Sequence, residues 1–407
     1  MSVPSRLLSD ADDLTGELTD LRHRLHRRPE IGLQLPQTQT MLLDAIADLG
    51  LELSVGERLT SITGVLRGGR TGPAVLLRAD MDGLPVQERS GAEFTSEIDG
   101  AMHACGHDLH MAMLVGAARL LAARREELHG DVVFMFQPGE EGWDGAGAMI
   151  DEGVLTAAGP MVSAAYGMHV QSNTTPNNLF TTRPGTMMAA SSRLVVTVRG
   201  SGGHGSTPHL GRDPISAAAE MLLALQLMVT RRFDIFDPVV LTVGTIHGGT
   251  ASNIIPDTAE FQATIRSFSE QTGQLVGDLA TIVCQGVAAA HGVEVDARYV
   301  AEYPVTINDP AQAGFLADVV ADVFGELRYQ AMASPLSGSE DFSRVLQAVP
   351  GCYVMLGATL ADDPATAPSN HSPLAVFDDA VLTTGAVLHT ELAMRSLAML
   401  TEAAPSR

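Results

Sequence analysis

Helical and strand-like hydrophobic spacings alternate along the first part of the chain. Leu14, Leu18, Leu21 and Leu25 recur every three or four residues, which predicts a helix that Pro29 brings to an end. Continuous apolar runs are typical of strands buried on both faces of a parallel sheet. In order, the pattern predicts a helix at about 37–49, strands near 62–67 and 74–78, a helix that begins near 109, and strands at 131–137 and 162–168. This alternation predicts an α/β fold in which a mostly parallel sheet carries helices on both faces.

The hydrophobic pattern changes at Ser192, where a half-exposed alternation begins. The elements predicted from there are a strand at 192–200, a helix at 214–230, strands at 239–246 and 258–268, a helix at 271–290 and a strand at 293–300. The order βαββαβ is that of a ferredoxin-like, two-layer unit. We therefore expect a second domain at 186–301 that is inserted into the first.

The alternation of the first domain returns after Tyr303 and Pro304. The predicted elements are helices at 311–324 and 340–347, a strand at 352–357, a loop with several prolines at 361–373 and a final helix at about 375–401. Residues 1–185 and 302–407 are thus expected to form one discontinuous domain. A chain of 407 residues exceeds the size at which a single core keeps growing, which agrees with two domains.

Composition excludes several classes of function. With 48 acidic and 25 basic residues the formal charge is −23, which argues against nucleic acid or an anionic membrane as a partner. Every basic residue is an arginine, so catalysis by a Schiff-base lysine, a pyridoxal-phosphate lysine or a phosphate-loop lysine is excluded. Three cysteines provide no disulfide framework, and we expect neither a signal peptide nor a membrane-spanning segment. These features predict a cytoplasmic protein.

A cluster of metal-ligating residue types occupies Met102–His110, directly ahead of a predicted helix. It contains a thiol, three imidazoles and a carboxylate, and Gly106 lets the backbone turn so that Cys105 and His107 can face one point. Thiolate and imidazole suit zinc-like or manganese-like divalent ions. Such a pair has a plainer interpretation as well, because a free cysteine is often a small buried hydrophobe and a histidine at a helix start can cap the helix. The interpretation as a metal site therefore depends on what else converges there.

Further acidic and imidazole groups follow predicted strands. Asp80 and Asp82, Glu140 and Glu141, and His169 each come at or after the end of an apolar run. In a parallel α/β sheet ligands bind outside the carboxyl ends of the strands, so we expect these side chains to gather. Two like charges about 4 Å apart repel by about 4 kcal/mol at an effective dielectric of 20, and bound cations would turn that repulsion into coordination. One carboxylate could then bind metal while its neighbour acts as a general base on water; alternatively, Glu140 and Glu141 merely cap the helix that follows them.

The chain resembles the dinuclear metallopeptidase superfamily of aminoacylases and carboxypeptidases, known as peptidase family M20. The branch it resembles most includes hippurate hydrolase, auxin-conjugate hydrolases and N-acyl-amino-acid deacetylases. Eight motifs that occur in order over nearly the whole chain carry the resemblance: Arg78–Pro85, His103–Asp108, Gln137–Glu141, Gly167–His169, Gly202–Ser206, Ser252–Pro256, Gly338–Phe342 and Asn370–Pro373.

The resemblance implies two divalent metal ions per subunit, with manganese or zinc expected and cobalt or nickel possible. The metal ligands that it implies are Cys105, His107, Glu141, His169 and His371. Glu140 would be the general base, and Asp82 the carboxylate that steadies a ligand beside the metals. Other branches have a ligand histidine at the position of Asp80, so the chain departs from them there, and we leave Asp80 out of the ligand set while its contact with metal stays open.

In the inserted domain the resemblance implies residues that act on the substrate. His204 would reach into the active site of a partner subunit and bind the oxyanion, which implies a homodimer built through this domain. Asn253 and Arg266 would hold the carboxylate end of the substrate, and Gly338 and Ser339 would contact it through the backbone. From the residues alone, His204 is a loop imidazole and Arg266 a salt-bridged strand residue. We interpret His103, His110 and His209 as structural.

These implications together predict a metal-dependent amidohydrolase that cleaves small N-acyl amino acids to a carboxylic acid and a free amino acid. A dipeptidase or carboxypeptidase of the same superfamily is the first alternative. A second alternative is an amide hydrolase that uses Cys105 as its nucleophile, because the thiol lies near a helix N-terminus with histidines nearby. A non-catalytic binding protein on the same fold is a third, although such a protein would be expected to lack Glu140 or a ligand.

Overall fold

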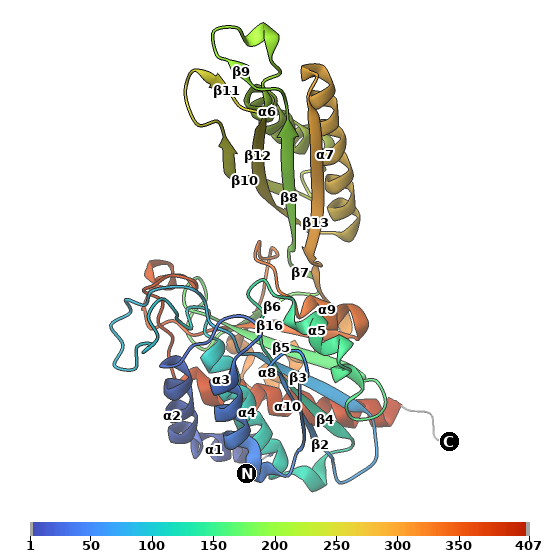
Figure 1. Ribbon diagram of the computed structural model, residues 1–407. Helices are drawn as coiled ribbons and strands as arrows, with labels where there is room; N and C mark the ends of the chain where they lie inside the picture. The colour runs from blue at the N-terminus through green and yellow to red at the C-terminus, as the bar shows by residue number, and fades with distance from the viewer. Residues whose placement is uncertain (1–2, 404–407) are drawn as a thin grey trace. The chain divides into compact units, whose positions relative to one another are not determined.

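The computed structural model describes residues 3–403, which form two compact units. The first unit comprises residues 3–185, 307–333 and 344–403. The second comprises Thr186–Thr306 and Ser334–Ser343. Two further strands, β7 (Gly185–Met188) and β14 (Thr306–Asn308), occur where the chain passes from one unit to the other (Figure 1).

The first unit alternates helices and strands along the chain. Its helices are α1 (Val3–Asp12), α2 (Thr15–His26), α3 (Pro36–Ile46), α4 (His107–Ala122), α5 (Gly145–Asp151), α8 (Pro310–Phe324), α9 (Ser343–Ala348) and α10 (Val381–Ala403). Its strands are β1 (Glu52–Val55), β2 (Ile62–Leu66), β3 (Ala74–Asp80), β4 (Asp131–Gln137), β5 (Ala164–Gln171), β6 (Phe180–Thr182), β15 (Tyr329–Ala331) and β16 (Gly351–Gly357).

These strands form one sheet in the order β1-β2-β4-β3-β5-β16-β6-β15. The central strands are parallel: β3 lies between β4 and β5, and β5 also pairs with β16. Antiparallel pairs occur on either side of this centre, such as β1 with β2, β2 with β4, and β16 with β6. The predicted mostly parallel α/β sheet is confirmed. The carboxyl ends of β3, β4 and β5 meet at one edge, which is where the predicted ligands lie.

Helices cover both faces of this sheet (Figure 1). α4 and α10 pack on β3 and β5 and on each other, and α5 lies on the opposite face (Figure 1). The contact between α4 and its neighbours is close at Gly116, where a Cβ atom would come within 2.9 Å of both Ala386 and Leu18. Burial of apolar side chains between α4 and its neighbours stabilises this packing by roughly 25 cal/mol per Å² of apolar surface removed from water. The packing holds α4 in place and thereby also the segment that precedes it.

The second unit has strands β8 (Ala190–Arg199), β10 (Val239–Gly248), β12 (Thr258–Ser267) and β13 (Glu294–Tyr303) and helices α6 (Pro214–Arg232) and α7 (Glu270–His291). The strands form an antiparallel sheet in the order β10-β12-β8-β13, which confirms the predicted ferredoxin-like βαββαβ unit. Burial alternates along β12 because one face packs on the helices and the other is exposed. A short ladder of β9 (Gly203–His204) and β11 (Ile254–Ile255) extends from one end.

Among the described helices, α7 is long and apolar enough to cross a membrane by length and composition alone. Its buried residues, which include Val276, Ala280 and Cys284, pack in the same core as Phe261 and Leu194 of the sheet. One face of α7 is therefore already covered by protein, as in the core helix of a two-layer unit.

The structure corrects several predicted boundaries. β3 continues through Asp80 and β5 through Gln171, so Asp80 and His169 lie within strands and not after them. The last helix begins at Val381, because Asp378 accepts the backbone N–H of Ala380 and forms a turn ahead of it. The helix predicted at 340–347 begins only at Ser343. Helix α1 and the short strands β1, β6 and β15 were not predicted from the hydrophobic pattern.

Candidate metal centre

A left-handed turn at Gly106 places Cys105 and His107 side by side. Gly106 has a φ of 83° and precedes the first residue of α4. A Cβ atom at this position would come within 2.4 Å of Val170 Cγ2. Glycine is therefore required both by the backbone conformation and by the close approach of β5.

Two imidazoles, the buried His107 and the partly buried His169, present their Nε2 atoms to the centre. His107 donates Nδ1–H to the carbonyl oxygen of Asp82 at 2.8 Å, and His169 donates Nδ1–H to that of Val170 at 2.7 Å. Each backbone acceptor fixes the tautomer and leaves the Nε2 lone pair free to bind a cation. The Nε2 atom of His107 is buried and has no hydrogen-bond partner among the described residues. An uncompensated buried nitrogen of this kind fits a metal ligand.

Cys105 lies between two other ligand candidates. Its Sγ is 3.3 Å from Nε2 of His169 and 3.2 Å from Nε2 of His371, and the latter nitrogen is 3.2 Å from Oε1 of Glu141. Three sets made up of predicted ligands and the predicted general base have ligand atoms that all lie within 4.8 Å of one another: Cys105, His107 and His169; Cys105, Glu141 and His371; and His107, Glu140 and Glu141. A further set in the first unit joins Asp80 to His107 and His110. Because the sets overlap, the donors suit a pair of neighbouring cations, with Cys105 common to two sets. The structure thus brings together all the predicted ligands and the predicted general base.

Asp82 organises the centre without belonging to any of these sets. Its Oδ1 accepts the backbone N–H of Glu140 at 2.9 Å and its Oδ2 accepts that of Glu141 at 3.1 Å. Its carbonyl oxygen accepts the proton of His107 described above. One residue just beyond the end of β3 thereby orients both glutamates and one histidine. Through these hydrogen bonds Asp82 would hold the ligands in place, which is the role that the sequence resemblance implies for it.

His371 depends on its neighbour Asn370 for its position. His371 lies in a loop with a φ of 70°, and its backbone N–H donates to Ala104 at 2.9 Å. The Asn370 amide donates to the carbonyl oxygens of Cys105 at 3.2 Å and Val170 at 3.0 Å. This role of Asn370 was not predicted, although the residue stands directly before His371 in the motif Asn370–Pro373.

Asp80 lies beside the centre in a buried network of its own. Its two oxygens bind Arg78 Nη1 and His110 Nδ1, each at 2.6 Å. His110 Nε2 accepts the N–H of Val170 at 2.8 Å, so the His110 proton is on Nδ1. Burial opposes ionisation of Asp80, but the charge of Arg78 and the nearby imidazoles outweigh it and lower the pKa. Asp80 is 3.6 Å from His107 Nε2, yet Arg78 and His110 already bind both of its oxygens.

The electrostatics of the centre favour positive charge. Hydrogen bonds to Cys105 and Glu141 raise the pKa of His371 to about 10. Burial opposes charging of His107, but the charge of Asp80 outweighs it and raises the pKa of that imidazole. Burial likewise opposes ionisation of Glu141, and the hydrogen bond from His371 prevails and lowers its pKa. Burial lowers the pKa of His169, so this imidazole stays neutral. In the absence of metal, protons on His107 and His371 supply the positive charge that cations would otherwise bring.

Two of the predicted substrate residues lie together at one end of the second unit. His204 pairs with Ile254 across the β9–β11 ladder, and the backbone N–H of Gly205 donates to the carbonyl oxygen of Asn253 at 2.8 Å. His204 is exposed, and its Nδ1 accepts the N–H of Ser206 at 3.0 Å.

The other predicted substrate residues lie at the opposite end of the second unit. Arg266 pairs with Ser191 near the start of β8 and hydrogen-bonds to its hydroxyl. Gly338 lies against Met188, just ahead of β8, and Ser339 follows it. Arg266 stands eight residues along β12 from Thr258, which is roughly 26 Å at about 3.3 Å per residue. Within the second unit of one chain, His204 and Arg266 are thus far apart.

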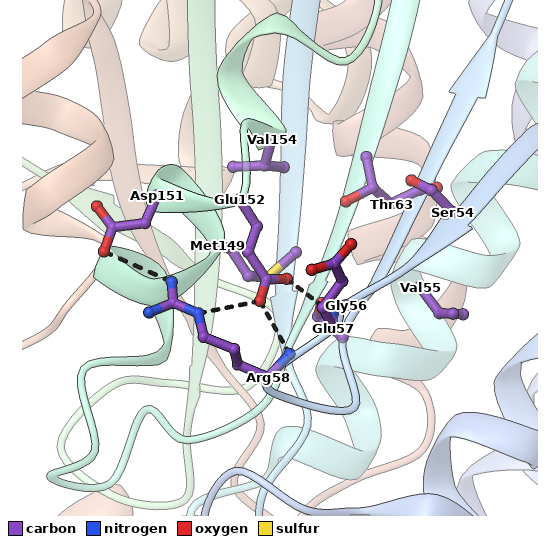
Figure 2. Close-up of a pocket in the computed structure, with 11 residues that line it drawn as sticks. Ser54, Val55, Gly56, Glu57, Arg58, Thr63, Met149, Asp151, Glu152 and Val154 are labelled. Atoms are coloured by element: carbon purple, nitrogen blue, oxygen red, sulfur yellow. Dashed lines mark hydrogen bonds and ion pairs between the residues drawn. The ribbon is translucent and has the colours of Figure 1, made fainter.

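A separate pocket of about 450 Å³ lies between the turn after β1 and the end of α5 (Figure 2). Glu152 accepts the backbone N–H groups of Glu57 and Arg58 at 3.3 and 3.0 Å. The guanidinium of Arg58 reaches Asp151 as well as Glu152 (Figure 2). None of the predicted site residues lines this pocket, and its Arg58, Asp151 and Glu152 side chains pair with one another.

The chain belongs to peptidase family M20/M25/M40, which matches residues 76–395. It is 36% identical over 399 residues to thermostable carboxypeptidase 2 of Saccharolobus solfataricus, covering 97% of the chain and 99% of the relative. It is 36% identical over 402 residues to an IAA-amino acid hydrolase of Arabidopsis thaliana, covering 97% and 89%. Identity to hippurate hydrolase of Campylobacter jejuni is 32% over 391 residues, covering 96% and 99%.

The solved structures agree with this family. A Bacillus subtilis protein described as a dinuclear metal binding peptidase of family M20 superimposes with a TM-score of 0.81. It is 30% identical in sequence, and the match covers 95% of this chain and 99% of that one. The present chain is accordingly a metal-binding hydrolase of amide bonds, which confirms the enzyme class expected from the sequence.

Proposed function

We propose that the protein cleaves the amide bond of small N-acyl amino acids, using two divalent cations held by Cys105, His107, Glu141, His169 and His371. The overlap of these three ligand sets, two of which share the buried thiol of Cys105, carries this proposal. The hydrolases of IAA-amino acids and of hippurate among the relatives support an N-acylated amino acid as substrate. Thiolate, imidazole and carboxylate together suit manganese or zinc, and also cobalt or nickel.

In this mechanism Glu140 is the general base. Cations bound at the centre would supply a Lewis acid for the amide carbonyl and would make a water more acidic. Glu140 takes the proton of the attacking water and passes it to the leaving amine nitrogen. Its backbone N–H is held by Asp82, and its carboxylate lies within 4.8 Å of ligand atoms of His107 and Glu141. These contacts fix the carboxylate beside the ligands on which the water would be activated.

The second unit would bind the substrate ends. Arg266 offers a bidentate fork for the substrate carboxylate, and Gly338 and Ser339 lie at the same end of that unit. His204 and Asn253 lie at the opposite end. We therefore assign oxyanion stabilisation to His204 of the partner subunit, with Asn253 beside it, which requires a homodimer built through this unit.

A carboxypeptidase is the second candidate function, because relatives from Saccharolobus solfataricus carry that name. The two functions share the metal centre and Glu140. They differ in the acyl group of the scissile amide, which is a simple carboxylic acyl group in the first function and an amino acid or peptide residue in the second. A screen of N-acetyl, N-benzoyl and indoleacetyl amino acids against dipeptides and longer peptides separates them. The screen is run with manganese, zinc, cobalt and nickel supplied separately. Higher kcat/KM for the peptides would replace the first proposal by the second.

The test of the mechanism is the substitution Glu140→Gln. This variant should bind the same amount of metal as the wild type and lose nearly all turnover. Near-normal turnover would contradict the role of Glu140. Chelator treatment followed by added metal tests the alternative in which Cys105 is the nucleophile. Loss and recovery of activity would support the metal mechanism, whereas a chelator-resistant enzyme that accumulates an acyl-thioester would contradict it.

A further inference from the structure

A buried ion-pair network lies next to the candidate metal centre, around Asp108 at the start of α4. Asp108, which directly follows His107, accepts hydrogen bonds at the same oxygen from Arg22 Nε and from His26 Nδ1, both at 2.8 Å. Arg22, His26 and Asp108 are all buried. Two cations of α2 therefore converge on the carboxylate that stands next to a proposed ligand.

Each of these cations also binds a second carboxylate that is connected, through the chain or through a backbone hydrogen bond, to the segment that carries His371. Arg22 Nη1 binds Asp379 at 2.9 Å, in the turn that follows the loop of His371. His26 Nε2 binds Glu88 at 3.2 Å. The next residue, Arg89, donates its backbone N–H to the carbonyl oxygen of Pro373 at 2.7 Å. Both routes thus connect the start of α4 with the segment that carries His371.

The charge state of His26 suits this bridging role. Both of its ring nitrogens face carboxylate oxygens, so both must carry protons to donate. Burial opposes this charge, but Asp108 and Glu88 outweigh it and raise the pKa of His26 to about 9. Phe94 covers the pair on one side, with its ring 4.5 Å from Cζ of Arg22. At neutral pH the network therefore contains two fixed positive charges.

His371 is the proposed ligand that most needs such support. Its side chain is 55% exposed, and it comes from a loop with left-handed backbone. Cys105 and His107, by contrast, are held by the start of a buried helix. Without contacts that tie the loop to that helix, the distance between the two sides of the centre would vary.

We infer that Arg22 and His26 are positioning residues, a two-cation clamp that holds the segment carrying His371 against the segment carrying Cys105 and His107. The inference rests on the metal centre of the proposed function. The clamp residues do not touch the ligands or the substrate. They act through Asp108, Asp379 and Glu88 on the spacing of the two halves of the donor set.

The chain offers a matched control on the same helix. His23 Nε2 binds Asp379 at 2.8 Å and its ring stacks on Phe94, but it makes no contact with Asp108. It therefore binds only one side of the network. If the clamp acts by bridging both sides, His23→Gln should change metal binding far less than His26→Gln or Arg22→Ala.

A pocket of about 300 Å³ allows chemical rescue as a second test. It is lined by Arg22, His26 and Asp379, together with Glu88 and Phe94. In Arg22→Ala the lost guanidinium leaves a space that opens into this pocket, so free guanidinium ion can reach Asp108 and Asp379. A merely structural role in folding would not be restored by a small cation added to the folded protein.

The experiment titrates metal-free wild type, Arg22→Ala, Arg22→Lys, His26→Gln and His23→Gln with manganese, and measures stoichiometry and affinity by calorimetry. We expect Arg22→Ala and His26→Gln to bind the second ion 10- to 100-fold more weakly, as is usual when a residue supporting a metal ligand is lost. His23→Gln should resemble the wild type. Millimolar guanidinium should restore Arg22→Ala and leave His26→Gln unchanged. Thermal unfolding of the metal-free proteins shows which variants are folded, and Arg22→Lys replaces Arg22→Ala if the latter is not.

The outcomes separate the two proposals. A wild-type chain that binds no divalent cation contradicts the proposed function. A wild-type chain that binds two ions, with folded Arg22 and His26 variants that bind both equally tightly, contradicts the clamp and leaves the proposed function intact. Equal weakening in His23→Gln also contradicts the clamp, because that variant keeps both bonds to Asp108.

Discussion

The side-chain amide of Asn370 donates to the carbonyl oxygen of Cys105 at 3.2 Å, although the two residues are 265 positions apart. The same amide donates to Val170, next to His169. One side chain therefore joins the three chain segments that supply Cys105, His169 and His371. The centre depends on such contacts because its donors come from distant parts of the sequence.

Replacement of Asn370 by Ala should loosen this junction. The variant removes a donor from the carbonyl oxygens of Cys105 and Val170, the second of which keeps its bond from His169, and it frees the loop that carries His371. We expect a fall of about 10- to 100-fold in metal affinity, with little change in the cooperativity of unfolding. Calorimetric titration with manganese measures the first and urea unfolding the second. Asn177→Ala is a matched control at another loop amide, which binds Asp378 and does not contact the centre.

Glu140→Gln should lower kcat by about 10²- to 10⁴-fold, the range usual for loss of a general base. The glutamine keeps the backbone N–H that donates to Asp82, so the turn should stay in place. Steady-state kinetics with an N-acyl amino acid and metal analysis of the same sample provide the measurement. If metal is lost together with turnover, Glu140 is a ligand and its assignment as the base alone is wrong.

Metal affinity should rise with pH. In the metal-free protein, hydrogen bonds to Cys105 and Glu141 raise the pKa of His371 to about 10, so at neutral pH this imidazole carries a proton that a metal ion must displace. Raising the pH towards 10 removes that competition and strengthens binding. Titrations in buffers of different ionisation enthalpy count the protons released. His371→Gln should release fewer protons, and a pH-independent affinity would oppose this account.

His26 should make the stability of the metal-free protein depend on pH. Its pKa rises from the ordinary 6.5 to about 9 in the folded protein, because Asp108 and Glu88 outweigh the opposing effect of burial. The charged form thus stabilises the fold fully below about pH 6.5, and this contribution is lost as the pH rises through about 9. The difference in unfolding free energy between the wild type and His26→Gln should shrink between these values. Urea unfolding at a series of pH values checks it, and a constant difference would contradict it.

Mixed dimers test the role of His204. If His204 acts in the partner's site, His204→Ala and Glu140→Gln each inactivate both sites of their own homodimer. A heterodimer of the two variants contains one site with an intact Glu140 and an intact partner His204. Mixing the inactive variants under conditions of subunit exchange should restore up to about a quarter of wild-type activity, from half of the sites in half of the dimers. No recovery despite exchange would place His204 in its own subunit's site.

Hydrophobic periodicity predicted the fold because both units bury regular elements. Strand β4, for example, has the bounds that its apolar run predicts. The order βαββαβ of the second unit was predicted from the alternation of hydrophobic and polar residues. Short strands such as β6 and β15 carry too few residues for a period to appear. The start of α10 was predicted too early, since the turn formed by Asp378 depends on a side-chain hydrogen bond and not on hydrophobic spacing.

The candidate site was predicted only in part for a related reason. Residues of ligand type near strand ends, such as Glu141 and His169, can be predicted as site residues from the sequence because metal binding requires those residue types. Residues that hold those ligands through contacts between distant parts of the chain give no such signal. From the sequence, Arg22 and His26 are simply polar positions of an amphipathic helix. The bond from Arg22 to Asp108 spans 86 residues, a relationship that spacing along the chain cannot express.

The arrangement of the ferredoxin-like unit has a consequence for how the enzyme is assayed. His204 and Arg266 stand at opposite ends of β12, a span longer than an N-acyl amino acid, so the unit of a single chain does not bring both to the same molecule. If both serve one reaction, specific activity becomes a function of enzyme concentration. Specific activity should decline on dilution, because the dimer dissociates according to the law of mass action, and it should recover when the sample is concentrated again.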